Sequence, residues 1–73
     1  MEEIYVDGLR SKDAYKYEEW LLEEGYKIYT KLEPHGRFTT IVIDTLGLSN
    51  DDMFYLEDLL RMMETDGAEI FYA

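Results

Sequence analysis

The sequence predicts a single α+β domain whose elements follow the order strand, helix, strand, strand, helix, strand. Three observations support this order. Four short segments have the alternation or the β-branched composition of strands, and two longer segments repeat apolar residues at helical spacing. Glycine, proline and serine residues mark most of the boundaries between them. The 73 residues fit one domain, 1–73, close to the smallest size at which a core is self-sufficient.

The first strand and the first helix come from the N-terminal third of the chain. Residues 3–7 alternate apolar and polar side chains, which is the period of a half-buried strand. Ser11 is expected to cap the helix that follows, and Gly25 is expected to end it. The apolar face of this helix would contain Ala14, Tyr17 and Leu21.

A hairpin is predicted next. Residues 26–33 alternate again, and residues 38–45 are rich in β-branched side chains, as a central strand is. Between them, Pro34-His35-Gly36 is a turn signal. Because the break is so short, the two strands should pair directly with each other.

The second helix has the clearest boundaries in the sequence. Ser49 is expected to cap it, and Asp52 three positions later approaches a capping box. Gly67 is expected to end it, and residues 68–72 read as a last short strand. The buried stripe should consist of Met53, Leu56, Leu59, Leu60 and Met63.

This element order is that of the ferredoxin-like fold, an antiparallel four-stranded sheet with two helices on one face. The other sheet face would then be bare. Three aromatic residues are expected on it: Tyr5, Tyr29 and Phe71. Their layout resembles the base-stacking platform of RNA-recognition motifs, although the glycine-rich aromatic signature of that family is absent.

Charge is the most unusual feature of the composition. Seventeen acidic residues against seven basic ones leave a net charge of −10. From Phe38 onward there are eight acidic residues and one basic residue, Arg61. Phosphate contacts supply most nucleic-acid affinity, so we expect no direct nucleic-acid binding and no binding to anionic membranes. Such a field attracts basic protein surfaces instead.

The absence of cysteine, of a membrane-spanning run and of a secretory signal pattern bears on where the protein is expected to be located. There is no cysteine, so neither a disulfide nor a thiolate metal site is expected. The sequence has no apolar run of membrane-spanning length, and its start lacks the pattern of a secretory signal. We therefore expect a cytoplasmic protein with no contact to membranes.

No enzymatic site is expected. His35 is the one histidine, and it lies in a turn signal without a recognisable nucleophile. Carboxylate pairs are plentiful but fall on helix faces open to water, whereas acid–base catalysis needs a dry cleft. The segment 49–52 lacks the alternating acids of a calcium loop. The sequence thus predicts no catalytic residue, no cofactor and no metal.

The acidic residues themselves are the best candidates for a partner-binding surface. Asp51 and Asp58 lie two turns apart on the second helix, and acidic residues one helical turn apart have Cβ atoms about 5–6 Å from each other, comparable with phosphate spacing. Aromatic and methionine side chains outside the buried stripe add interface anchors. The predicted contact residues are Asp51, Asp52, Phe54, Tyr55, Glu57, Asp58, Met62 and Glu64, with Glu19 and Glu23, and nearby Glu24, on the first helix.

In size, acidity and aromatic content, the chain resembles the small DNA-mimic inhibitors that bacteriophages make against bacterial DNA-binding proteins. The resemblance implies an anti-defence or regulatory protein in the host cytoplasm that binds a basic DNA-binding partner. Such a partner would be an HU-type nucleoid protein, a restriction or CRISPR nuclease, or a repair enzyme.

Two alternatives remain open. One is a non-mimetic interaction module, antitoxin-like or regulatory, that forms a homodimer through Tyr5, Tyr29 and Phe71. The other is an accessory domain that binds a small ligand or a metal.

Overall fold

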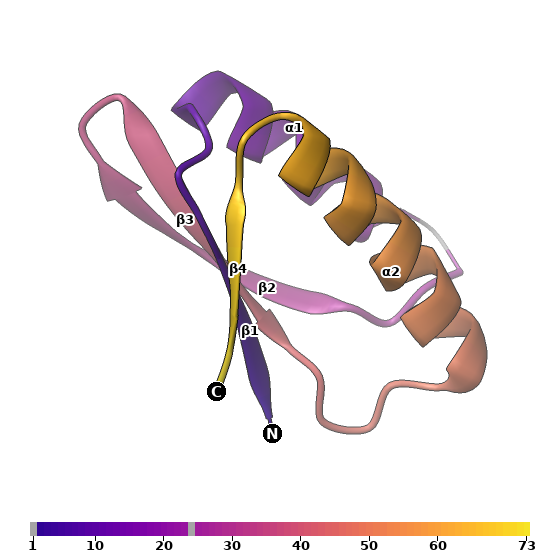
Figure 1. Cartoon of the computed structure of the whole chain (residues 1–73). Coiled ribbons are helices and arrows are strands. Elements are labelled where there is room, and N and C mark those ends of the chain that lie inside the picture. Colours follow the sequence, from indigo (N-terminus) through magenta and orange to yellow (C-terminus); the bar gives the residue numbers. More distant parts are fainter. Residues whose placement is uncertain (1, 24) are drawn as a thin grey trace.

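The computed structural model describes residues 2–23 and 25–73 and has the expected order of elements (Figure 1). The α+β class is therefore confirmed. The elements are β1 (Glu3–Asp7), α1 (Ser11–Leu21), β2 (Tyr29–His35), β3 (Phe38–Asp44), α2 (Asn50–Thr65) and β4 (Glu69–Tyr72). The four strands form one antiparallel sheet in the order β2-β3-β1-β4.

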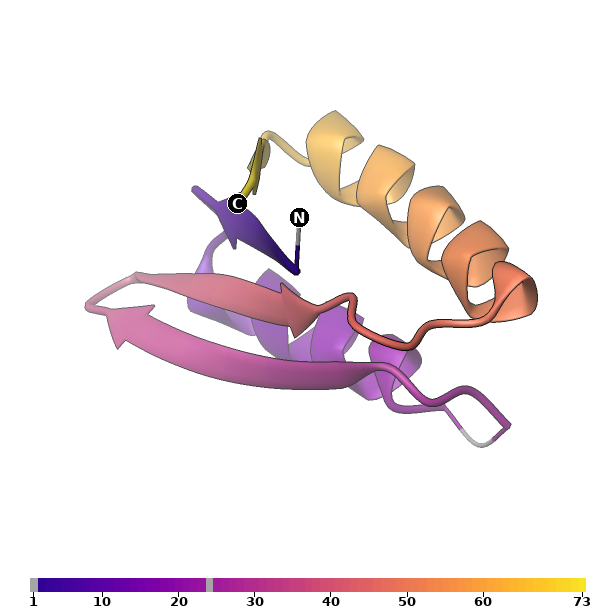
Figure 2. The same cartoon turned by 90° about the horizontal axis from the view of Figure 1, so that it is seen from below.

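The register of the central strands separates the two faces of the sheet. Ile4 pairs with Ile43, and Val6 pairs with Ile41, so these four side chains share one face. They belong to the same buried cluster as residues of both helices: Ala14, Tyr17, Leu21, Leu56, Leu59, Leu60 and Met63. Figure 2 shows the strong twist of the sheet and the two helices beside it. The expected buried stripes are confirmed except for Met53, which is only partly buried.

Of the two expected helix caps, only the one at Ser49 forms. The side chain of Ser49 accepts a hydrogen bond from the amide of Asp52 at 3.1 Å, and the carboxylate of Asp52 accepts one from the amide of Ser49 at 3.4 Å. Ser11 was expected to be a cap, and this is wrong. Arg10 occupies the N-cap position without a side-chain hydrogen bond, while the hydroxyl of Ser11 lies 2.7 Å from that of Thr39. Ser11 therefore ties α1 to the hairpin.

The end of α1 and the start of β2 also differ from expectation. The helix ends at Leu21, four residues before Gly25, because the amides of Leu22 and Glu23 already close a turn on Glu18 and Trp20. The second strand begins at Tyr29 and not at Tyr26. Tyr26 stacks on a side chain of α2, and this contact removes it from the strand.

The hairpin turn is shorter than the turn signal suggested. Pro34 and His35 belong to β2 and pair with Thr39 and Phe38. Proline is tolerated there because β2 is an edge strand, where a missing N–H need not break the ladder. Gly36 then begins a two-residue turn with φ of +67°, as a type II′ hairpin requires. Within the described residues, no helix is long and apolar enough to span a bilayer.

Candidate functional site

The outward side of α2 combines exposed carboxylates with exposed apolar side chains. The phenyl ring of Phe54 is 70% exposed, and the side chain of Met62 is 44% exposed. We call this surface the acidic face of α2 and define it as Asp51, Phe54, Glu57, Asp58, Met62 and Glu64, all of which are exposed. The capping box at Ser49 fixes where the helix begins and hence which side chains point outward.

Asp52 does not belong to this face, although the sequence suggested it would contact a partner. The residue is only 7% exposed, and its carboxylate accepts the hydrogen bond from the Ser49 amide. At the third helical position, the side chain reaches back to the amide of Ser49 at the helix start. Asp52 is therefore a helix cap.

The carboxylates of the acidic face are largely uncompensated. Arg61, one turn after Asp58, forms an ion pair with it, and both side chains are well exposed. Within the part of the chain that the structure describes, no basic group pairs with Asp51, Glu57 or Glu64. A cluster of exposed, unpaired carboxylates gives this side of the molecule a negative potential that attracts cations.

Tyr55 joins α2 to the end of α1. Its hydroxyl donates to the carbonyl of Trp20 and to the carboxylate of Glu23, the latter at 2.9 Å. Its ring stacks on Tyr26 with centroids 4.0 Å apart and planes 9° apart. Burial, together with the hydrogen bond to Glu23, raises the pKa of Tyr55 to about 12, so the phenol stays neutral at physiological pH. Tyr55 was expected to be an exposed interface residue, but its hydroxyl and its ring are already in contact with other residues of the chain.

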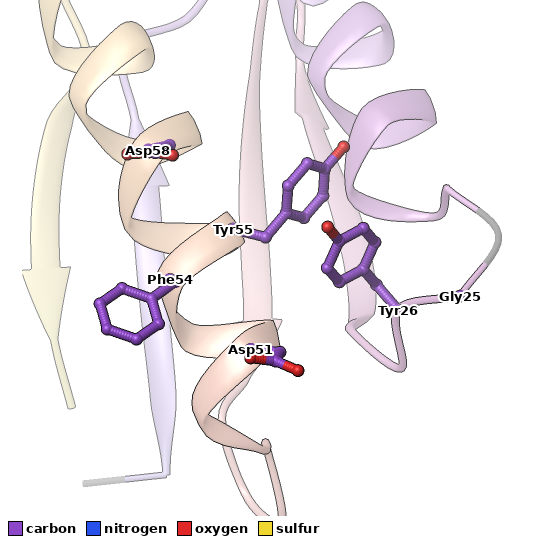
Figure 3. A pocket seen from close by; sticks show the side chains of 6 residues that line it. All are labelled: Gly25, Tyr26, Asp51, Phe54, Tyr55 and Asp58. Carbon is purple, nitrogen blue, oxygen red and sulfur yellow. The ribbon is translucent and has the colours of Figure 1, made fainter.

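A shallow open hollow of about 560 Å³ lies over α2 at this point. Figure 3 shows Phe54 on one side of the helix and the stacked tyrosines on the other, with the two aspartates along the helix. The hollow is lined by Gly25, Tyr26, Asp51, Phe54, Tyr55 and Asp58. Sequence reasoning did not anticipate Tyr26 here, because its place in an alternating pattern suggested a strand residue.

Of the two acidic residues predicted on the first helix, Glu19 lies on α1, whereas Glu23 lies two residues beyond its end because the helix ends at Leu21. Glu19 and Glu23 are both exposed, but the carboxylate of Glu23 is held by the Tyr55 hydroxyl. Only Glu23 therefore adjoins the hollow through a defined contact. Glu24 lies outside the described residues.

The sheet face that carries Tyr5 also carries the other two predicted aromatic residues, Tyr29 and Phe71. Tyr5 pairs with Phe71 on one side and with Val42 on the other, and Tyr29 lies at the end of β2. Tyr29 is 68% exposed and Phe71 is 50% exposed. The hydroxyl of Tyr5 donates to Glu3 at 3.0 Å, and this hydrogen bond raises the pKa of Tyr5. Carboxylates share this face, at Glu3, Asp7, Glu33, Asp44 and Glu69.

His35 lies next to the hairpin turn and lines a second shallow hollow with Asp7, Gly8, Phe38 and Thr40. The carboxylate of Asp7 accepts a hydrogen bond from the Thr40 hydroxyl at 2.9 Å. Within residues 2–23 and 25–73, no three His, Cys, Asp or Glu side chains are grouped to hold a metal ion.

Comparison with protein-family models, with curated proteins and with solved structures finds no match to this chain.

Proposed function

We propose that this chain is a non-catalytic, DNA-mimic inhibitor that places the acidic face of α2 on the basic nucleic-acid-binding surface of another protein and blocks it. The carboxylates take the place of phosphates, and the apolar side chains add contact area. The partner is a basic DNA-binding protein of the nucleoid, nuclease or repair classes, and the setting is the cytoplasm of a bacterial host.

One observation carries this proposal: Phe54, 70% exposed, lies among the exposed carboxylates of Asp51, Glu57 and Asp58. Exposed carboxylates alone are explained by solubility. A phenyl ring held in water adds nothing to solubility, and aromatic side chains are enriched at the centres of protein interfaces. An aromatic side chain surrounded by carboxylates is complementary to a protein surface that has basic side chains around an apolar area.

Electrostatics favours a cationic partner and disfavours nucleic acid. The chain has a net charge of −10, and Arg61, the one basic residue within α2, is already paired with Asp58. Association with a basic surface should therefore be fast and should weaken steeply as salt is added.

For the whole architecture, we infer a ferredoxin-like arrangement. The support is the strand order β2-β3-β1-β4 and the single buried cluster that contains residues of both helices. In such an arrangement α2 lies on the outside of the molecule along its full length, so its acidic face is presented without obstruction.

The proposal is tested by capture from a bacterial lysate on the immobilised chain at low salt, with separate elution by duplex DNA and by salt. The proposal predicts that basic DNA-binding proteins are captured and that both DNA and salt release them. Captured proteins that are neutral or acidic, and that DNA does not displace, would contradict it.

A second function is favoured by a different observation. Tyr29 and Phe71, 68% and 50% exposed, lie with Tyr5 on the sheet face opposite to the one that carries Ile4 and Val6. A regulatory module that binds through this face, to a second copy or to another protein, would lose binding when these rings become alanine. It would tolerate amidation of Asp51, Glu57 and Glu64, and this tolerance separates it from the mimic.

A further inference from the structure

The hollow over α2 contains two kinds of group that recognise the same chemistry. Phe54 and the Tyr26–Tyr55 stack supply aromatic rings, and Asp51 and Asp58 supply carboxylates. Aromatic faces attract cations through their quadrupole, and carboxylates attract them through charge. The combination is therefore selective for a positively charged group that also has a flat or apolar surface.

The aromatic wall is held in place before any ligand arrives. The hydroxyl of Tyr55 is fixed by the carbonyl of Trp20 and the carboxylate of Glu23, and its ring is stacked on Tyr26 at 4.0 Å. A wall that is already ordered loses little conformational entropy on binding. The opposite wall, Phe54, is exposed and has no ring contact among the described aromatic pairs.

The two aspartates are not equivalent. Asp58 already pairs with Arg61 of the same helix. Asp51 is exposed and has no cationic partner within the described residues. The carboxylate open to an incoming cation is therefore that of Asp51, and Arg61 competes with the incoming cation for Asp58.

We propose that this hollow receives one arginine side chain of the protein partner, with its guanidinium against the aromatic walls and paired to Asp51. This inference rests on the proposed function, since it names the group by which a basic partner is anchored. Arginine fits better than lysine because its planar guanidinium stacks on aromatic rings and binds carboxylates in a fork. The volume of about 560 Å³, open to solvent on the outer side, suits a side chain offered from another surface.

The test uses three short peptides, acetyl-Gly-Arg-Gly-amide and its lysine and citrulline counterparts, titrated into the isotopically labelled chain and followed by NMR. Citrulline keeps the planar shape of arginine without its charge. The arginine peptide should shift the signals of Phe54, Tyr55 and Tyr26 and bind more tightly than the lysine peptide. The citrulline peptide should produce no saturable shift.

Four variants locate the site. Asp51→Asn and Phe54→Ala should each weaken arginine-peptide binding by about five-fold, the size of one cation–π or charged contact. Arg61→Gln should strengthen it, because the competitor for Asp58 is removed. Glu2→Gln is the matched control: it changes the net charge equally but lies before β1, outside the acidic face of α2 and the hollow, so its effect should be less than two-fold.

Three results would overturn the inference. The first is an equal loss of affinity in Asp51→Asn and Glu2→Gln, which would indicate diffuse attraction to the net charge of the whole chain. The second is the largest shift at the sheet face, and the third is equal shifts with the citrulline peptide. The peptide titration uses no partner protein, so its failure would overturn this inference and leave the capture experiment unaffected. Conversely, arginine-peptide binding without any captured protein that DNA displaces would overturn only the proposed function.

Discussion

Two tyrosine hydroxyls form hydrogen bonds between the two helical segments of the chain. The hydroxyl of Tyr17 donates to the carboxylate of Asp66, just past the end of α2, and that of Tyr55 donates to the carbonyl of Trp20 and the carboxylate of Glu23. Both described ion pairs are exposed and neither joins the two helices, so these hydrogen bonds are the described polar side-chain contacts that connect α1 with α2 and the residues next to them. The phenols contribute only while they keep their protons.

These hydroxyls make the fold sensitive to alkaline pH. Burial, then the hydrogen bond to Asp66, raises the pKa of Tyr17 to about 12, and the pKa of Tyr55 is raised to about 12 in a similar way. Because the folded pKa lies above the ordinary tyrosine value of about 10, this stabilisation is complete below about pH 10 and is lost as the pH rises toward about 12. The free energy of unfolding, measured with urea from about pH 7 to about pH 11.5, should stay level up to about pH 10 and fall above it.

The variant Tyr17→Phe should lose about 1 kcal/mol at pH 7 and show a shallower fall above pH 10, since it lacks the hydroxyl. Tyr72→Phe, at a residue that is 63% exposed, is the matched control and should behave as wild type. An unchanged pH profile in Tyr17→Phe would show that this contact does not stabilise the fold.

The helix cap at Ser49 is a second residue-scale prediction. Ser49→Ala removes the acceptor for the amide of Asp52 and should lower the free energy of unfolding by about 1 kcal/mol in urea titrations. Ser49→Thr keeps the acceptor and should retain most of the stability. Equal losses in the two variants would mean that the hydroxyl is not the stabilising group.

The sequence predicted both serine caps, and the residue three positions later explains why only the cap at Ser49 forms. Ser49 is followed by Asp52, which can return a hydrogen bond, whereas Ser11 is followed by Ala14, which cannot. Without that reciprocal partner, the hydroxyl of Ser11 pairs with Thr39, far away in the sequence. Local pattern identifies a cap reliably only when both halves of the box are present.

At the scale of elements, the β2–β3 hairpin depends on Gly36. Its φ is +67°, and no atom lies within 4 Å of where a Cβ would be placed. Gly36→Ala therefore meets no clash, and its cost is backbone strain alone, about 1–2 kcal/mol. Thermal unfolding should show this loss, and Arg37→Ala in the same turn should show little change. A neutral Gly36→Ala would show that the turn readily adopts another conformation.

Elements with local boundary signals were predictable, and those set by distant contacts were not. The helix α2 has a cap, a stripe and a terminal glycine within its own sequence, and its expected extent is confirmed. The start of β2 was placed too early because Tyr26 continues the alternation of that strand, while in the fold it stacks on Tyr55. The hollow over α2 depends on this stacking, so the exposed acids were predictable and the aromatic wall was not.

For the whole molecule, the net charge of −10 sets a condition on stability. Like charges in a compact state repel one another, and salt screens that repulsion within a Debye length of about 10 Å at 0.1 M. The midpoint of thermal unfolding should therefore rise between about 10 mM and about 300 mM NaCl, and a gain of about 1 kcal/mol corresponds to roughly 4–8 °C at this size.

Neutralising part of the charge should reduce that dependence on salt. The triple variant Asp51→Asn, Glu57→Gln, Glu64→Gln should show a smaller rise than wild type in the same calorimetric series. A midpoint that falls with salt in the wild-type chain would show that favourable ion pairs outweigh repulsion.

The central claim is that the acidic face of α2 recognises a cationic protein surface, and one comparison tests it most directly. The affinity for a captured DNA-binding protein is measured for wild type, for the α2 triple variant, and for a control triple, Glu2→Gln, Glu18→Gln, Glu69→Gln. Both triples change the net charge equally, but only one alters α2. We predict that the α2 triple loses at least ten-fold in affinity and that the control triple keeps most of it. Equal losses in the two triples, or no loss in either, would contradict the claim.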